Sequence, residues 1–136
     1  MADPLVCVVV NMKFFWCGKS GMRWGNLLPC LTELWKSRGG YPDLLIIHLG
    51  ENDLVKLSGL TLMQYMKRDL KMLKSGWGET EIVWTQFLPR RHWKGVFKHG
   101  AMDKARRKLN RAMRVFCDAY DIKVLSHNNI TEEQEY

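Results

Sequence analysis

A short apolar run in the middle of the chain constrains the fold more than any other feature. Residues 43–50 contain five Leu or Ile side chains and are bounded by Pro42 and Gly50. A run this short and this apolar is typical of a strand covered on both faces, as occurs in parallel sheets flanked by helices. We therefore expect residues 43–50 to form a central strand of an α/β sheet.

The rest of the chain alternates between strand and helix patterns. Short runs rich in Val, Ile or aromatic residues predict strands over 5–10, 81–87 and 122–125, and residues 11–16 either extend the first strand or form a second one. Apolar residues at spacings of three and four predict helices over 22–37, 60–74 and 101–120. Pro29 predicts either a kink in the first helix or a start near Leu28. This order implies βαβ units, a parallel sheet and right-handed crossovers.

Composition fits one globular domain over residues 1–127, followed by a polar, acidic tail over residues 128–136. The chain has 136 residues, of which 46% are hydrophobic and 26% charged, and these values exclude a wholly disordered chain. No apolar stretch approaches the roughly 18 residues that a bilayer-spanning helix needs. The four cysteines match no zinc-ligand spacing, so we expect buried, reduced thiols, no metal and no other cofactor. Without a secretory signal, the predicted location is cytoplasmic.

The formal net charge of +7 would attract polyanions. Residues 102–118 carry six basic and two acidic side chains, which gives this segment a charge of +4. Together with Arg90, the residues Arg106, Arg107 and Arg111 form a candidate patch for phosphates of a nucleic acid. The alternative is an outer helix face that is merely solvated.

Binding sites in parallel sheets lie beyond the carboxyl ends of the strands, which here selects the loops 17–23, 50–54 and 87–93. In the second loop, Gly50 permits a sharp turn or the close approach of a ligand. The carboxamide of Asn52 is a donor that could stabilise a developing oxyanion. A plain turn explains the same residues equally well, because Gly, Asn and Asp dominate turns. In the third loop, Trp93 either lines a pocket or packs internally.

Several segments taken together resemble one enzyme superfamily. They are Ser20-Gly21-Met22-Arg23-Trp24, Gly50-Glu51-Asn52-Asp53, Val83-Trp84-Thr85 and Leu88-Pro89-Arg90. In this combination and order they resemble the SGNH (GDSL-type) hydrolases, and more narrowly an esterase-like branch linked to retroelement reading frames. The resemblance implies a three-layer α/β/α sandwich with a parallel, flavodoxin-like sheet. It also implies hydrolysis of a small carboxylic ester through an acyl-serine intermediate. In that mechanism the Gly21 amide and Asn52 would form the oxyanion hole, and Gly50 would begin the Gly-x-Asn-Asp motif that contains Asn52.

Two motifs of that superfamily are missing from this sequence. Where a Gly-Asp-Ser-like turn would supply the nucleophile, the chain reads Asn11-Met12-Lys13, and no Asp-x-x-His follows Leu125. We therefore expect an incomplete SGNH-like domain that is inactive or a fragment, with little or no hydrolase activity. A replacement pairing of Ser20 with His48, His92 or His127 is the less favoured alternative. The second function class is a noncatalytic module that binds nucleic acid or a protein partner.

Overall fold

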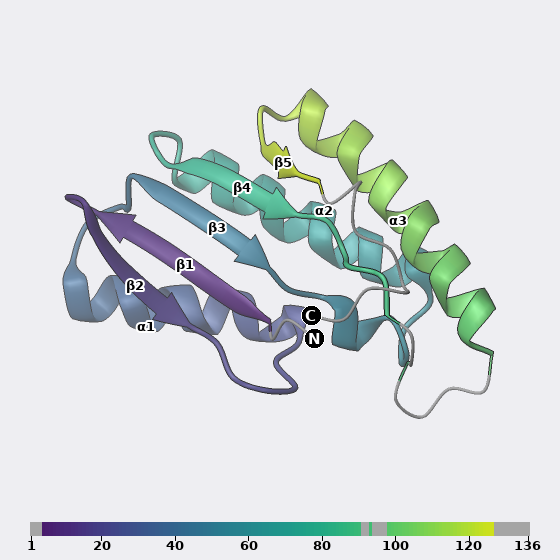
Figure 1. Ribbon diagram of the computed structural model, residues 1–136. Coiled ribbons are helices and arrows are strands. Elements are labelled where there is room, and N and C mark those ends of the chain that lie inside the picture. The colour runs from purple at the N-terminus through teal and green to yellow at the C-terminus, as the bar shows by residue number, and fades with distance from the viewer. Residues whose placement is uncertain (1–3, 91–92, 94–97, 127–136) are drawn as a thin grey trace.

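The computed structural model describes residues 4–90, 93 and 98–126, and its strands form one mixed five-stranded sheet. The strands are β1 (Leu5–Val10), β2 (Lys13–Cys17), β3 (Leu44–His48), β4 (Glu81–Thr85) and β5 (Lys123–Leu125), in the order β2-β1-β3-β4-β5. The helices are α1 (Leu27–Arg38), α2 (Gly59–Gly76) and α3 (His99–Ala119), with short 3-10 turns η1 (Trp24–Asn26) and η2 (Glu51–Asp53). Figure 1 shows this arrangement. The α/β class expected from the sequence is confirmed.

The expectation of an all-parallel sheet is wrong for the first strand. Strand β1 pairs antiparallel with both β2 and β3, whereas β3, β4 and β5 are parallel. The cause is a tight hairpin turn at Asn11 and Met12, whose φ angles are 50° and 64°. Two-residue hairpin turns that match the strand twist need positive φ at both central residues, and Asn adopts it more readily than most residues. The segment after Val10 is therefore a second strand rather than an extension of the first.

The three helices form a single layer. The connections through α1, α2 and α3 each run between parallel strands and all step toward the β5 edge of the sheet. Right-handed crossovers that step in one direction place their helices on one face of the sheet. Figure 1 shows α1 and α2 behind the sheet in this view. In the described part of the chain, no helix covers the opposite face, so the third layer of the expected sandwich is not seen.

The core lies between this helical layer and the sheet. Its buried side chains come from one face of β1, β3 and β4 and from the inner stripes of the helices: Val6, Val8, Leu45, Ile47, Ile82, Trp84, Leu27, Leu31, Leu62, Met66, Leu70, Leu109 and Met113. Each such side chain contributes about 1.5–3 kcal/mol when it is removed from water. On the uncovered face of β2, Phe14 and Trp16 remain 60% and 64% exposed. The face opposite the helices is therefore exposed at β2, whereas Cys7 and Val9, which pair with Trp16 and Phe14, are buried on the same face.

Helix α1 begins at Leu27, which agrees with the predicted start near Leu28. Pro29 is its third residue and lies in the first turn. Backbone N–H groups in the first turn have no partner within the helix, so a proline there costs no hydrogen bond. The start of the helix, and not a kink, accommodates Pro29.

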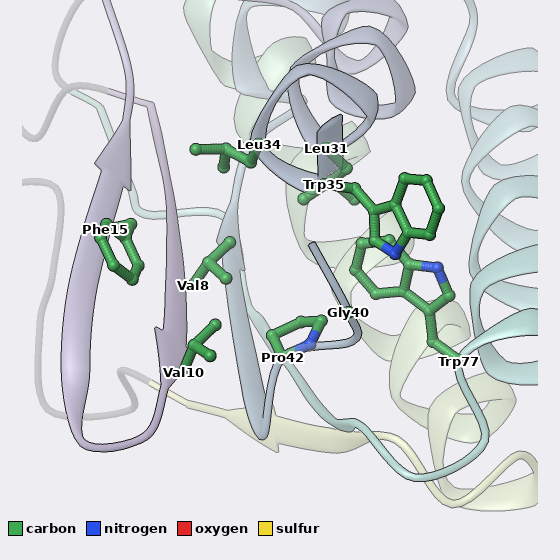
Figure 2. Close-up of a pocket in the computed structure, with 9 residues that line it drawn as sticks. All are labelled: Val8, Val10, Phe15, Leu31, Leu34, Trp35, Gly40, Pro42 and Trp77. Atoms are coloured by element: carbon green, nitrogen blue, oxygen red, sulfur yellow. The ribbon is translucent and has the colours of Figure 1, made fainter. Parts of the chain in front are cut away.

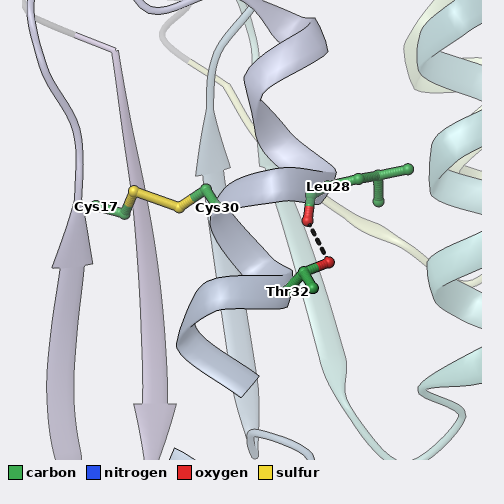
Figure 3. Close-up of a disulfide and its surroundings, with 4 residues drawn as sticks. All are labelled: Cys17, Leu28, Cys30 and Thr32. Atoms are coloured by element: carbon green, nitrogen blue, oxygen red, sulfur yellow. Dashed lines mark hydrogen bonds between the residues drawn. A yellow bond between two sulfur atoms is a disulfide. The ribbon is translucent and has the colours of Figure 1, made fainter. Parts of the chain in front are cut away.

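A disulfide joins the edge strand to the first helix. Cys17, at the end of β2, is bonded to Cys30 in α1 (Figure 3). The expectation of four reduced thiols is therefore wrong for these two residues. Cys7 and Cys117 are free and buried, and burial raises the pKa of the Cys117 thiol to about 12.

Within the residues that the structure describes, no helix is long and apolar enough to cross a membrane.

A small apolar pocket lies between α1 and the sheet, toward the amino-terminal end of β3 (Figure 2). Its wall includes Val8, Pro42, Trp35 and Trp77. Tyr41 lies between the two indoles, with ring centroids 6.4 Å from Trp35 and 6.1 Å from Trp77. The cavity volume is about 20 Å³, which is room for about one water molecule. This pocket is a packing feature rather than a ligand site.

Candidate functional site

The loop after β3 begins with a glycine that no other residue could replace without strain. Gly50 has a φ of 115°, and a Cβ added there would lie 2.8 Å from the Phe87 ring. Positive φ is accessible to glycine at little cost, and the absence of a side chain lets the ring pack against the backbone. The chain can therefore turn sharply at the end of the strand and enter the 3-10 turn η2, which contains Asn52.

Two hydrogen bonds bring the two motif segments of the sequence together. The Nδ2 of Asn52 donates to the carbonyl oxygen of Met22 over 3.1 Å. The backbone N–H of Trp24 donates to Oδ2 of Asp53 over 2.7 Å. Asn52 therefore lies beside the residue that follows Gly21, and Gly21 itself is exposed with a φ of 79°. The structure thus places the two predicted oxyanion residues in one neighbourhood, although one Asn52 N–H is already used.

Buried carboxylates hold this neighbourhood in position. Asp69 on α2 is buried and accepts a 2.9 Å hydrogen bond from the indole Nε1 of Trp24. Burial raises the pKa of Asp53, and the N–H of Trp24 and the charge of Arg23 oppose this shift. The segment around Trp24 is therefore fixed at two atoms, by carboxylates that lie on two different elements.

A groove opens beside the Gly21 segment. It has a volume of about 550 Å³ and lies between the end of β2 and helix α1. Its lining includes the cysteines of the disulfide together with Trp16, Lys19, Met22, Asn26, Pro29, Glu33, Leu34 and Ser37. This volume lies within the range typical of small-molecule sites. Met22 belongs to both features, because its carbonyl receives Asn52 while the residue also lines the groove.

A buried set of polar residues lies where β3 and β4 end. The Oε1 of Glu51 is 2.9 Å from His48 Nε2, and its Oε2 accepts a 3.3 Å hydrogen bond from Arg90. The Nδ1 of His48 is 2.6 Å from the hydroxyl of Thr85, which in turn donates to the carbonyl of Ile47 over 3.1 Å. His48, Glu51 and Thr85 are buried, and each contacts another member of this set or the backbone. Because these groups are enclosed and already partnered, we assign this set a structural role.

The predicted nucleophile replacement is not formed by the described residues. Ser20 is exposed, whereas His48 is buried and is occupied by Thr85 and Glu51. The other two candidate bases, at positions 92 and 127, lie outside the described residues, as do the tail over 128–136 and position 91. A search of the described ranges also finds no group of three or more side chains suited to hold a metal ion.

Arg90 and Trp93, both predicted to contact a ligand, are buried against each other. The Arg90 guanidinium lies 4.9 Å from the centroid of the Trp93 ring, and the ring is 1% exposed. The backbone N–H of Trp93 donates to His99 Nδ1 over 3.0 Å. Trp93 therefore packs internally, which is the second of the two predicted alternatives. The guanidinium of Arg90 contacts Trp93 and Glu51.

Asn110 is a positioning residue that the sequence reasoning missed. Its Oδ1 accepts from the N–H of Phe87 over 2.9 Å, and its Nδ2 donates to the carbonyl of Phe87 over 3.0 Å. Arg106 donates to the same carbonyl over 3.3 Å and pairs with Asp103 at 2.8 Å. These contacts fix the ring that closes over Gly50. The only signal in the sequence was a polar residue beside Leu109 on the apolar stripe of a helix.

The three arginines predicted as a phosphate patch separate into two groups. Arg106 points inward, with a side chain 11% exposed, and is occupied by Asp103 and Phe87. Arg107 is 58% exposed and Arg111 is exposed as well. Only the latter two are accessible to a ligand, which corrects the place of Arg106 in the predicted patch.

Comparison with known proteins adds no family assignment. No protein-family model matches this chain. No curated protein matches it either.

Proposed function

We propose that this chain is an esterase-like domain of the SGNH hydrolase type that binds a small ester but does not turn it over. The observation that carries the proposal is the pair of hydrogen bonds from Asn52 to Met22 and from Trp24 to Asp53. They join the two sequence segments that resemble the oxyanion-hole motifs of that superfamily.

The chemistry expected at this place is polarisation of an ester carbonyl. Asn52 retains a second N–H beyond the one donated to Met22, because a carboxamide has two donors. The exposed amide of Gly21 would be the other donor to the carbonyl oxygen. The groove that Met22 lines would accommodate the acyl or alcohol part of the ester. Donors fixed before reaction stabilise a developing oxyanion.

Acyl transfer needs a nucleophile and a base in addition to these donors. The described residues do not supply that pair, because Ser20 has no histidine beside it and His48 is buried with Glu51. We therefore expect ester binding with hydrolysis close to the background rate.

A cytoplasmic location stays a prediction. The disulfide removes one of the grounds for it, since disulfides are rare in the cytosol.

An assay with a short-chain aryl ester tests both halves of the proposal. Ligand-observed NMR should detect ester binding, and Asn52→Ala should weaken it by roughly 2- to 10-fold, which corresponds to one hydrogen bond. Gln64→Ala, at an exposed position on α2, is the matched control and should leave binding unchanged. Release of the aryl alcohol should not exceed that of an unrelated protein.

Two results would contradict the proposal. Turnover well above background that is abolished by Asn52→Ala would show an active hydrolase. Absence of any ester binding, or equal binding by wild type and Asn52→Ala, would remove the oxyanion role. The second function class, a basic module that binds nucleic acid, is supported by a separate observation and is developed next.

A further inference from the structure

The net charge of the chain is confined to two helices. Helix α2 contains four basic and one acidic residue, and α3 contains six basic and two acidic residues. The ten basic and three acidic residues of the two helices give +7, which equals the formal charge of the whole chain. The remaining 11 basic and 11 acidic residues cancel. The excess of basic over acidic residues in this chain is therefore matched by the composition of these two helices.

On α3 the accessible cations form a stripe along the side opposite the core. We call Lys104, Arg107, Lys108, Arg111 and Arg114 the basic stripe, and all five are exposed. At 3.6 residues per turn they fall within about 120° of the helix circumference, facing away from the buried Leu109 and Met113. Among the described residues, Arg107 pairs with Asp103 and Arg114 donates to the hydroxyl of Ser126 over 2.7 Å. The exposed Asp118 falls within the same arc, so the stripe and this carboxylate together carry +4. Like charges at such spacing repel one another, and a polyanion would relieve that repulsion.

Helix α2 extends this positive surface at its junction with α3. The ammonium groups of Lys67 and Lys71 lie 5.8 Å and 5.9 Å from the centroid of the Phe116 ring, and Lys71 also lies 5.3 Å from that of Tyr120. Lys74 donates to the carbonyl of Asp121 over 2.9 Å. The contacts of Lys67 and Lys71 hold their ammonium groups against the end of α3, so these two charges add to those of the stripe. Lys74 is paired with the Asp121 carboxylate at 3.6 Å and adds less.

We propose that the outer surface of α2 and α3 binds the phosphate backbone of a nucleic-acid duplex without reading its base sequence. The basic stripe runs from Lys104 to Arg114, ten helical steps or about 15 Å at 1.5 Å per residue. Over that axial length one strand of a duplex presents roughly four phosphates, at about 3.4 Å per phosphate. The stripe therefore offers about one exposed cation for each phosphate of one strand. This activity is independent of ester binding.

A lipid surface fits the same helices less well. Amphipathic helices that bind membranes insert an apolar face among the acyl chains. The apolar face of α3, with Leu109, Met113 and Phe116, is already buried in the protein core. The apolar side chains exposed on the two helices, Leu60, Tyr65, Met72 and Val115, are few beside their ten basic residues. We therefore favour a duplex over a membrane and make membrane binding an outcome of the test.

Fluorescence anisotropy with a labelled 20-base-pair DNA duplex tests the proposal. The test variant is Lys104→Gln, Arg107→Gln, Lys108→Gln and Arg111→Gln, in which glutamine keeps a good helix propensity. The matched control is Lys13→Gln, Lys19→Gln, Lys36→Gln and Lys56→Gln, which removes the same charge from exposed positions outside the two helices.

For the wild type, the logarithm of the binding constant should fall linearly with the logarithm of the salt concentration. Each neutralised phosphate contributes about 0.9 to the slope, so removal of up to four contacts should reduce it by up to about 3.6. The test variant should lose at least tenfold in affinity at 50 mM salt. The control should lose less than threefold, and a second duplex of scrambled sequence should bind equally well.

Several outcomes would overturn the proposal. The first is absence of duplex binding at 50 mM salt, and the second is a salt-dependence slope below about 2 for the wild type. The third is an equal loss of affinity in the test variant and the control, which would mean that duplex binding depends only on the net charge of the protein. Stronger binding to phosphatidylserine vesicles than to the duplex would assign the surface to membranes instead. The wild-type slope does not depend on the folding of any variant, so it decides the question even if the test variant misfolds.

Discussion

Replacement of Gly50 by alanine tests the geometry of the candidate site most directly. The φ of 115° at this residue is one that L side chains rarely adopt, and the new Cβ would lie 2.8 Å from Phe87 Cζ and 3.2 Å from Phe87 Cε1. The ring cannot easily move away. It packs edge-on against Trp84 at 5.9 Å, and Asn110 holds the Phe87 backbone on both sides.

The expected cost follows from two separate contributions. A non-glycine residue in such a conformation costs about 1–3 kcal/mol. Overpacking against a fixed ring adds about 1–3 kcal/mol. The lower entropy of alanine in the unfolded chain returns about 0.4–1 kcal/mol. The net loss for Gly50→Ala is then about 1–5.6 kcal/mol, which can be a large part of the typical 5–15 kcal/mol stability of a domain.

Two other glycines separate the contributions experimentally. Gly21 has a φ of 79° but open space around its Cβ position, so Gly21→Ala carries only the backbone strain. Gly59 begins α2 with open space and without positive φ, so Gly59→Ala should be neutral or slightly stabilising. Urea unfolding followed by circular dichroism should rank the losses as Gly50 above Gly21 above Gly59. If Gly50→Ala costs no more than Gly21→Ala, the contact with Phe87 is not what requires the glycine.

Three further predictions concern other parts of the structure. Burial raises the pKa of Asp53 above 3.8 in the folded protein, so the stability associated with its protonated form is fully present below about pH 3.8 and is lost as the pH rises through the folded-state pKa. The free energy of unfolding of the wild type, measured relative to that of Asp53→Asn, should therefore fall over this pH range. A difference that stays flat or rises with pH would contradict this. Thiol titration of the denatured, unreduced protein should find two free thiols, and four after reduction, because Cys17 and Cys30 are bonded; four thiols without reductant would refute the disulfide. Asn110→Ala should cost about 1–3 kcal/mol in urea unfolding because it leaves the buried N–H of Phe87 without a partner, and a loss below 0.5 kcal/mol would refute that role.

Hydrophobic periodicity predicted most secondary-structure elements to within a few residues, but not the direction of the first strand. Strand β3 was expected over 43–50 and forms over Leu44–His48, and the helix expected over 101–120 forms over His99–Ala119. Periodicity reports which side chains are buried and carries no information about strand direction. That direction was decided by positive φ at Asn11 and Met12. Neither residue is a glycine, so the usual sign of a tight hairpin was missing.

The site was predictable only where a motif was local. Gly50 and Asn52 stood out because they follow a buried strand, and the structure places Asn52 beside the Gly21 segment. The misplacement of Arg106 has a different origin. Charge composition cannot show which cation on a helix turns inward, and Arg106 does so because Asp103 and the Phe87 carbonyl provide acceptors there. The Asp103 partner is local in sequence, but the Phe87 carbonyl is 19 residues away, and no sequence pattern shows that Arg106 reaches it.

Helices α2 and α3 carry ten of the 21 basic residues and three of the 14 acidic ones, so the layer that they form is positively charged. Near a polyanion the protein would rotate before contact, so that the helices in Figure 1 lead. The uncovered sheet surface, with the rings of Phe14 and Trp16, would then point into solvent. When the protein is bound to a polyanion through α2 and α3, these exposed apolar rings would face away from the polyanion. Neighbouring bound copies would then be able to contact them.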